Sequence, residues 1–179
     1  MTDYAASPKD VHDQQRSVFD RLLGDWTVVR EIPGYASATG VARIIPIDAE
    51  TARYEESVRL SLIHGETLNG TQCYLYRQRP DVPLQIQILF CDTAELFQTL
   101  AFREEGRLWR ATARFLCGAD EYESEYRLDE QGWQVQHTVC GPRKNYRIET
   151  VYRKADDVGR ARYNTGDGER AGNYFFNVR

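Results

Sequence analysis

The sequence predicts an all-β fold, an antiparallel up-and-down barrel preceded by one short helix. About ten short segments between residues 26 and 153 alternate apolar and polar side chains, the period of a half-buried strand. Turn signals separate them at intervals of roughly 8–12 residues. No long helical pattern intervenes, which argues against a parallel sheet. The connections are all short, whereas a Greek key needs a long crossover, so an up-and-down barrel is favoured.

Composition narrows the classes of protein to consider. With 179 residues and 41% hydrophobic residues, the chain is large enough for one domain with a core. The net charge of −4 argues against a nucleic-acid-binding protein. No apolar run is long enough for a signal peptide or a membrane span, so we expect a cytoplasmic protein without a membrane partner.

The four cysteines do not form a Cys-x-x-Cys pair. They are spread along the chain as Cys73, Cys91, Cys117 and Cys140. In a chain without a secretion signal, such cysteines are expected to be free thiols in a reducing compartment.

Three regions differ in composition. Residues 1–15 are polar and are expected to form a flexible leader, and residues 16–154 carry the barrel pattern. Residues 155–179 are rich in glycine but end in the aromatic triplet Tyr174-Phe175-Phe176. Because exposed aromatic side chains are costly, we expect this triplet to dock on the barrel or on a second copy in a homodimer.

The elements follow in order. Arg16–Leu23 spaces its apolar residues as a helix does, and Gly24 ends it. The expected strands are Trp26–Ile32, Ala38–Ile47, Arg53–Ile63, Thr71–Arg79, Leu84–Cys91, Glu95–Arg103, Arg107–Cys117, Glu121–Leu128, Trp133–Cys140 and Lys144–Arg153. A Gly141-Pro142 corner, followed by two cations, joins the last two strands.

Gly24-Asp25-Trp26, at the start of the first strand, resembles the Gly-x-Trp signature of lipocalin-like (calycin) barrels. The resemblance implies that Trp26 lies at the barrel base, covered by an arginine of the last strand. Arg153 has a suitable position for this role, and the contact would be of the cation–π type.

A longer match is more specific. The chain contains Phe19-x-x-Leu22-x-Gly24-x-Trp26-x-x-x-Arg30-x-Ile32, Cys117-x-x-Asp120-x-Tyr122-x-x-x-Tyr126 and Gly141-Pro142-Arg143-Lys144-Asn145-Tyr146, in that order. Over residues 19–154 it is similar to a bacterial lipocalin-like domain family of unknown function, number 6314. The resemblance implies a fold and a pocket rather than a reaction. Asn145 replaces the usual aspartate of the last motif, and Gln98 and Phe115 stand where we expect histidines.

The sequence offers no local metal or acid–base motif. His12, His64 and His137 lack the close spacing of a ligand pair, so we expect neither a metal site nor a cofactor. His137 is the one candidate for a haem ligand, but a lone strand histidine is more often simply packed or hydrogen-bonded. Glu55 and Glu56 are neighbours in a strand, so their side chains point to opposite faces.

The ligand-binding candidates gather around the last turns of the barrel. Tyr122 and Tyr126 share one face of a strand, which Asp120 joins if the strand extends to it. Asp120 could pair with Arg143 or Lys144, either to orient a ligand beside Tyr146 or as a structural salt bridge. Arg30 lies on an otherwise apolar face and must pair inside the barrel unless that face is partly wet.

Three hypotheses about function follow. The first is a barrel that binds a small apolar or aromatic molecule, either neutral or anionic. The residues at its cavity mouth would be Tyr122, Tyr126, Arg143, Lys144 and Tyr146. The second is an isomerase, cyclase or lyase that uses tyrosine and Asp120 as acid and base in the same cavity. The third is an interaction protein that docks through its aromatic tail.

Overall fold

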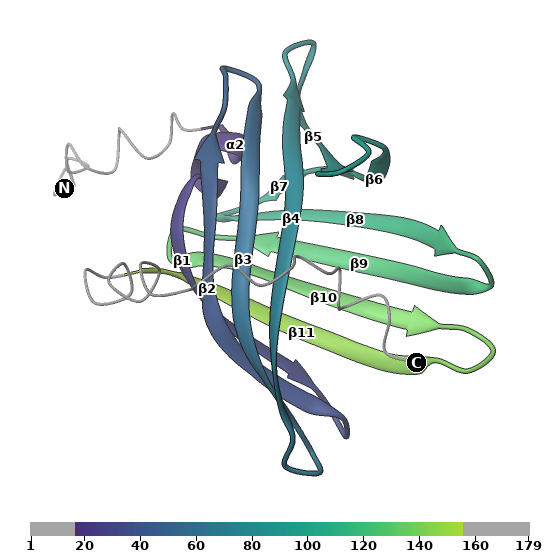
Figure 1. The fold of residues 1–179 in the computed structure, drawn as a ribbon. Helices are drawn as coiled ribbons and strands as arrows, with labels where there is room; N and C mark the ends of the chain where they lie inside the picture. The colour runs from purple at the N-terminus through teal and green to yellow at the C-terminus, as the bar shows by residue number, and fades with distance from the viewer. Residues whose placement is uncertain (1–16, 156–179) are drawn as a thin grey trace, which may run out of the picture.

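The computed structural model describes residues 17–155 (Figure 1). The expected leader and the aromatic triplet of the tail lie outside these residues. Within them, a helix and eleven strands follow the order that the sequence predicts, and the all-β prediction is confirmed.

Helix α2 (Val18–Leu22) precedes the barrel. It begins at Ser17, whose hydroxyl accepts a hydrogen bond from the Asp20 N–H while the Asp20 carboxylate accepts one from the Ser17 N–H. This reciprocal capping satisfies two backbone donors of the first turn. Val18, Phe19 and Leu22 are buried in the core. In the described part of the chain, no helix has the length and apolarity that a membrane crossing requires.

The strands form one antiparallel sheet. They are β1 (Gly24–Ile32), β2 (Ala36–Pro46), β3 (Thr51–Leu62), β4 (Thr67–Arg79), β5 (Val82–Phe90), β6 (Leu96–Ala101), β7 (Arg103–Glu105), β8 (Leu108–Cys117), β9 (Asp120–Leu128), β10 (Gly132–Cys140) and β11 (Asn145–Lys154). The spatial order is β6-β5-β4-β3-β2-β1-β11-β10-β9-β8-β7, so sequence neighbours pair, except for β6 and β7, and β1 joins β11. The up-and-down topology is therefore confirmed.

The sheet is nearly closed on itself. In Figure 1, β2, β3 and β4 run upright while β8–β11 cross the view, so the two halves enclose the core between them. Strands β6 and β7 are the two edges of the sheet. We call the place where β6 lies against β8 the seam. Phe97 of β6 and Phe115 of β8 meet there edge to face, with ring centroids 4.8 Å apart.

One expected strand is in fact two. The pattern Glu95–Arg103 predicts a single strand, but β6 pairs with β5, whereas β7 pairs with β8 on the opposite edge of the sheet. Phe102 lies between them, and its N–H donates to the carbonyl of Leu84 at 2.8 Å. The chain therefore changes edges in the middle of a continuous alternating pattern.

The base of the barrel differs from the expectation in one residue. Trp26 is buried, and its indole N–H donates to the carbonyl of Leu22 at 2.9 Å. Lys154, not Arg153, covers the ring, with its Nζ 3.9 Å from the ring centroid. Lys154 is the residue directly opposite Trp26 in the β1–β11 register, and Arg153 points the other way because strand side chains alternate.

The prediction of four free cysteines is wrong for one pair. Cys73 and Cys91 form a disulfide between β4 and the residue that follows β5. Their neighbours Tyr74 and Phe90 are directly opposite in the sheet register, which brings the two cysteines together although they are eighteen positions apart in the sequence. Cys117 and Cys140 are free and exposed.

Candidate functional site

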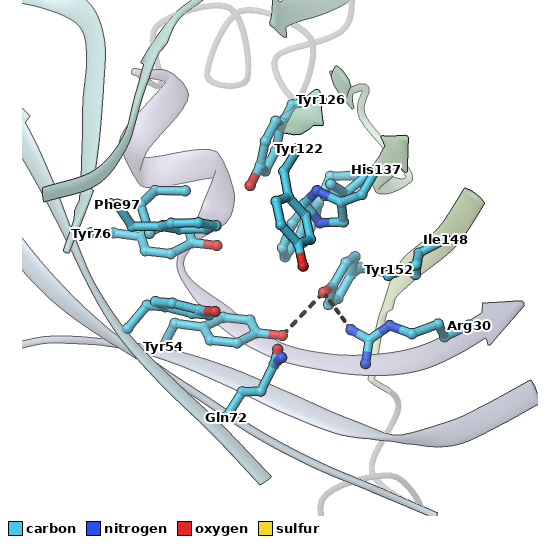
Figure 2. A pocket seen from close by; sticks show the side chains of 14 residues that line it. Arg30, Tyr54, Gln72, Tyr76, Phe97, Tyr122, Tyr126, His137, Ile148 and Tyr152 are labelled. Carbon is cyan, nitrogen blue, oxygen red and sulfur yellow. Dashed lines mark hydrogen bonds between the residues drawn. The ribbon is translucent and has the colours of Figure 1, made fainter. Parts of the chain in front are cut away.

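The barrel encloses a narrow cavity that is partly open to solvent. Its volume is about 50 Å³. Six tyrosines contribute to the lining: Tyr54, Tyr74, Tyr76, Tyr122, Tyr126 and Tyr152. Apolar and aromatic side chains complete much of the wall: Ile88, Phe97, Trp133, Val135 and Ile148. Figure 2 shows Tyr54, Tyr76 and Phe97 on one side and Tyr122, His137 and Tyr152 on the other.

An ion pair is buried at the edge of the cavity. Arg30 of β1 donates through both Nη atoms to the two carboxylate oxygens of Glu56 of β3, each at 2.8 Å. Its Nε donates to Thr150 Oγ1 at 2.8 Å. Both charged residues are less than 5% exposed. The expectation that Arg30 pairs inside the barrel is confirmed. In this bidentate geometry each charge compensates the other at a place where both are shielded from water.

Two tyrosines complete the shell of the ion pair. The hydroxyl of Tyr54 donates to Glu56 Oε2, and Tyr152 lies 3.4 Å from the same oxygen. The two hydroxyl oxygens are 3.0 Å apart. Trp133 stacks on Tyr152 with ring centroids 3.5 Å apart, which fixes that ring from one side.

Burial sets the protonation of the tyrosines. It is the main cause that raises the pKa of five of them above the usual value of 10: Tyr54, Tyr74, Tyr76, Tyr126 and Tyr152. For Tyr54, Tyr74 and Tyr152, the negative charge of Glu56 raises the pKa further. These hydroxyls therefore stay protonated and can donate hydrogen bonds at any physiological pH.

A second group of hydrogen-bonded side chains passes on the inner side of β8. Tyr126 donates to Gln98 Oε1 at 3.2 Å, and Gln98 Nε2 donates to Ser124 Oγ at 2.7 Å. Ser124 Oγ is also 2.7 Å from Nδ1 of His137. Gln98 comes from β6, so these hydrogen bonds connect the β6 side of the seam with β9 and β10. The strand between them, β8, leaves room because its residue opposite Ser124 is Ala113.

His137 is neutral in this environment. Burial, and then the positive charge of Arg30, lower the pKa of its imidazole from 6.5 to about 4. The ring lines the cavity and lies edge-on to Tyr126, with centroids 6.3 Å apart.

The cluster expected at the mouth forms in part. Lys144 pairs with Asp120 at 2.9 Å and donates to the Tyr122 hydroxyl at 3.4 Å. The hydrogen bond to Asp120 is the main cause that raises the Lys144 pKa. The side chains of the pair are 19% and 18% exposed, so the pair is mostly shielded from solvent. Arg143 is exposed on the turn and does not line the cavity.

The other residues expected at the cavity mouth do not all lie at the cavity. Tyr146 is half-buried and packs on Tyr35 at 5.7 Å between ring centroids, outside the cavity lining. Tyr122 and Tyr126 do line the cavity and are at most 6% exposed. The structure thus places two of the five proposed mouth residues at the cavity.

Gly141 and Pro142 hold the last turn. A Cβ on Gly141 would overlap the Asp120 carboxylate, so a glycine is needed for the turn to close on that side chain. The Gly141 N–H donates to the carbonyl of Lys144 at 2.7 Å. Pro142 is exposed.

Sequence reasoning missed several residues that bond to the side chains lining the cavity. Glu56 does not form an acid–base couple with Glu55, but its position on the same face as Tyr54 and Val58 is a signal of a buried partner for Arg30. Ser124 and Gln98 meet only through tertiary packing, and nothing in their local sequence indicates it. In the described residues, no three of His, Cys, Asp and Glu come close enough together to hold a metal ion.

The fold and the cavity define the chain as a nearly closed antiparallel β-barrel with an aromatic and polar interior. The chain belongs to a family of unknown function, DUF6314, whose model matches residues 22–154. No curated protein matches the chain.

Several solved structures are similar over most of the chain. Rv2717c from M. tuberculosis is 12% identical, with a TM-score of 0.46, and the match covers 85% of this chain and 100% of that chain. The redesigned β-barrel mFAP1, bound to DFHBI, is 9% identical, with a TM-score of 0.39 and coverage of 78% and 100%. A second redesigned barrel, b11L5F_LGL, is 9% identical, with a TM-score of 0.40 and coverage of 79% and 98%.

Proposed function

We propose that this protein binds a small, planar, uncharged molecule, one end of which enters the barrel cavity. The observation that carries the proposal is a cavity whose walls are mainly aromatic rings and whose interior charges are already paired. Aromatic walls favour planar ligands through stacking and edge-to-face contacts.

The pairing of charges favours a neutral ligand over an anionic one. The guanidinium of Arg30 is bound on both Nη atoms by Glu56, and Lys144 is held by Asp120. An anion would have to compete with a carboxylate that is already in place and already desolvated. His137 is neutral and adds no positive charge.

The cavity volume limits the part of the ligand that enters. A volume of about 50 Å³ holds only a few heavy atoms, while pockets for whole drug-sized molecules measure about 300–1,000 Å³. Because the cavity is partly open, the ligand is expected to insert a narrow end and leave the rest at the mouth.

Binding fits these residues better than acid–base catalysis does. General acids and bases work best with a pKa near the operating pH. Among the cavity residues whose pKa is shifted, the tyrosines move upward and His137 moves down to about 4, both away from neutrality. Asp120, the acid that the enzyme hypothesis requires, pairs with Lys144 outside the cavity lining.

The proposal can be tested by NMR on the indole groups. The chain has three tryptophans, of which Trp133 lines the cavity and Trp109 does not. Toluene, phenol and benzoate share a ring but differ in polarity and charge. We expect toluene and phenol to shift the Trp133 indole signal and benzoate to leave it unchanged. A shift caused by benzoate alone, or by none of the three, would contradict the proposal.

A pair of variants supplies the control. Ile148→Phe enlarges a side chain that lines the cavity, and Arg147→Phe places the same ring on the exposed face of β11. We expect the first variant to abolish the shift at Trp133 and the second to keep it.

A further inference from the structure

We propose that His137 determines the specificity of the cavity by donating its Nε2–H to a carbonyl oxygen of the ligand. This inference rests on the proposed function, because it names the chemical group that the cavity recognises. Ser124 and Gln98 would be positioning residues that act through His137 and do not touch the ligand.

The first support is the position of the ring. His137 lies on the inward face of β10 and lines the cavity, where Figure 2 shows it beside Tyr122 and Tyr152. Its Nδ1 side is occupied by Ser124, which is fully buried and is not part of the cavity lining. The Nε2 edge is therefore the polar edge that the ring can offer to a ligand.

The second support is the direction of the hydrogen-bond chain. Ser124 accepts from Gln98 Nε2, and a serine hydroxyl has one proton to donate. We assign that proton to His137 Nδ1, which lies 2.7 Å from Ser124 Oγ. In this assignment Nδ1 is the unprotonated nitrogen, and the neutral imidazole carries its proton on Nε2. Tyr126, which donates to Gln98 Oε1, fixes the orientation of the amide at the start of the chain.

The third support is the excess of donors around the cavity. The indole N–H of Trp133 is buried without a hydrogen-bond partner among the described residues, and Trp133 lines the cavity. Burial keeps the hydroxyls of Tyr74 and Tyr76 protonated, because it raises the pKa of both. The carboxylate of Glu56 beside the cavity is already bound by Arg30 and Tyr54. A ligand with a hydrogen-bond acceptor would pair with these donors. A carbonyl is a small planar group that supplies an acceptor without a charge.

The tautomer can be observed directly. Long-range ¹H–¹⁵N spectra of the full chain with ¹⁵N-labelled histidine distinguish Nε2–H from Nδ1–H. We expect the pure Nε2–H form for His137, with the exposed His64 as an internal reference for exchange between the two forms. In Ser124→Ala, the signature of His137 should change to a mixture. An Nδ1–H form in the unmodified protein would overturn the inference.

The ligand chemistry is tested with a matched pair of probes. Acetophenone and α-methylstyrene have nearly the same shape, but the second has C=CH₂ in place of C=O. We expect acetophenone to bind about threefold to tenfold more tightly, the range for one net hydrogen bond. In His137→Phe the preference should disappear, and Ser124→Ala, which keeps the imidazole, should reduce it.

The outcomes separate the two proposals. Equal binding of both probes to the unmodified protein would overturn the role of His137 and leave cavity binding intact. Binding of neither probe would contradict both. A preference that survives in His137→Phe would assign the carbonyl to another donor and overturn the inference.

Discussion

Arg30 and Glu56 form a buried, bidentate ion pair in the barrel interior. Each residue alone would be an unpaired charge in an apolar environment, and together they make two direct hydrogen bonds. Removing one partner of such a pair usually costs far more than the pair contributes, because the other charge stays buried.

We therefore predict that Glu56→Gln lowers the free energy of unfolding by about 3–5 kcal/mol in urea titrations. Glu55→Gln is the matched control, because Glu55 pairs with Arg53 on the outer face of the same strand. A surface pair of this kind contributes at most about 1 kcal/mol. Equal effects of the two substitutions would contradict the burial of Glu56.

His137 should make stability depend on pH. Its pKa is about 4 in the folded state and 6.5 ordinarily, so between these values only the unfolded chain takes up the proton. The contribution is fully present above pH 6.5 and is lost as pH falls to about 4, at about 1.4 kcal/mol per pH unit. Unfolding measured from pH 7 to pH 4 should show this loss relative to His137→Gln, whose side chain does not titrate. Parallel curves for the two proteins would show that His137 is not buried as a neutral ring.

Single residues of the site were predictable where they broke a pattern. Arg30 on an apolar face indicated a buried partner, and Tyr122 and Tyr126 followed from strand alternation. Ser124 and Gln98 were not predictable as partners, because their contact depends on a small alanine in the intervening strand and on how the seam closes.

At the scale of the elements, the turn between β10 and β11 is locked onto the start of β9. Gly141 has no side chain because the Asp120 carboxylate occupies that space, and Lys144 reaches the same carboxylate. This geometry supports the structural interpretation of the Asp120–Lys144 pair.

We predict that Gly141→Ala destabilises the protein by about 1–3 kcal/mol, the usual cost of overpacking. The cost should be much smaller when Asp120→Ala is also present, because the overlapping carboxylate is gone. Thermal unfolding of the single and double variants measures the coupling between them. Simple additivity of the two substitutions would mean that Gly141 and Asp120 do not share this space.

The disulfide is a second constraint on how the strands are held together. Cys73–Cys91 joins two residues that are eighteen positions apart and so closes a loop around the β4–β5 hairpin. By the chain-entropy argument, replacing both cysteines with serine should lower the free energy of unfolding by about 3 kcal/mol. The same change at Cys117 and Cys140, which are free, should have little effect. If thiol titration of the denatured, unreduced protein finds four thiols rather than two, the disulfide is absent.

The positions of most strands could be predicted from the sequence, whereas some of their pairing partners could not. Most strands were predictable because each inward face alternates with a polar outer face. The division of Glu95–Arg103 into β6 and β7 was not, since the alternation continues through Phe102 while the partner strand changes. The disulfide likewise depends on the register of β4 against β5, which local sequence does not determine.

For the whole molecule, the up-and-down barrel followed from short connections and from the absence of a long helical pattern between the strands. The volume of its interior did not, because it depends on how large side chains from different strands pack against one another. Six tyrosines and a tryptophan fill much of the space that the strands enclose and leave about 50 Å³. The aromatic and polar lining, rather than the size of the cavity, is what supports a small neutral ligand.

The most direct test of that central claim is native mass spectrometry of the protein purified from its own host, followed by organic extraction. We predict a discrete added mass that disappears on extraction and belongs to an uncharged planar compound. The Ile148→Phe variant should lack this mass, and Arg147→Phe should retain it. A chain that carries no added mass, or one whose added mass is equally present in Ile148→Phe, would contradict binding in the barrel cavity.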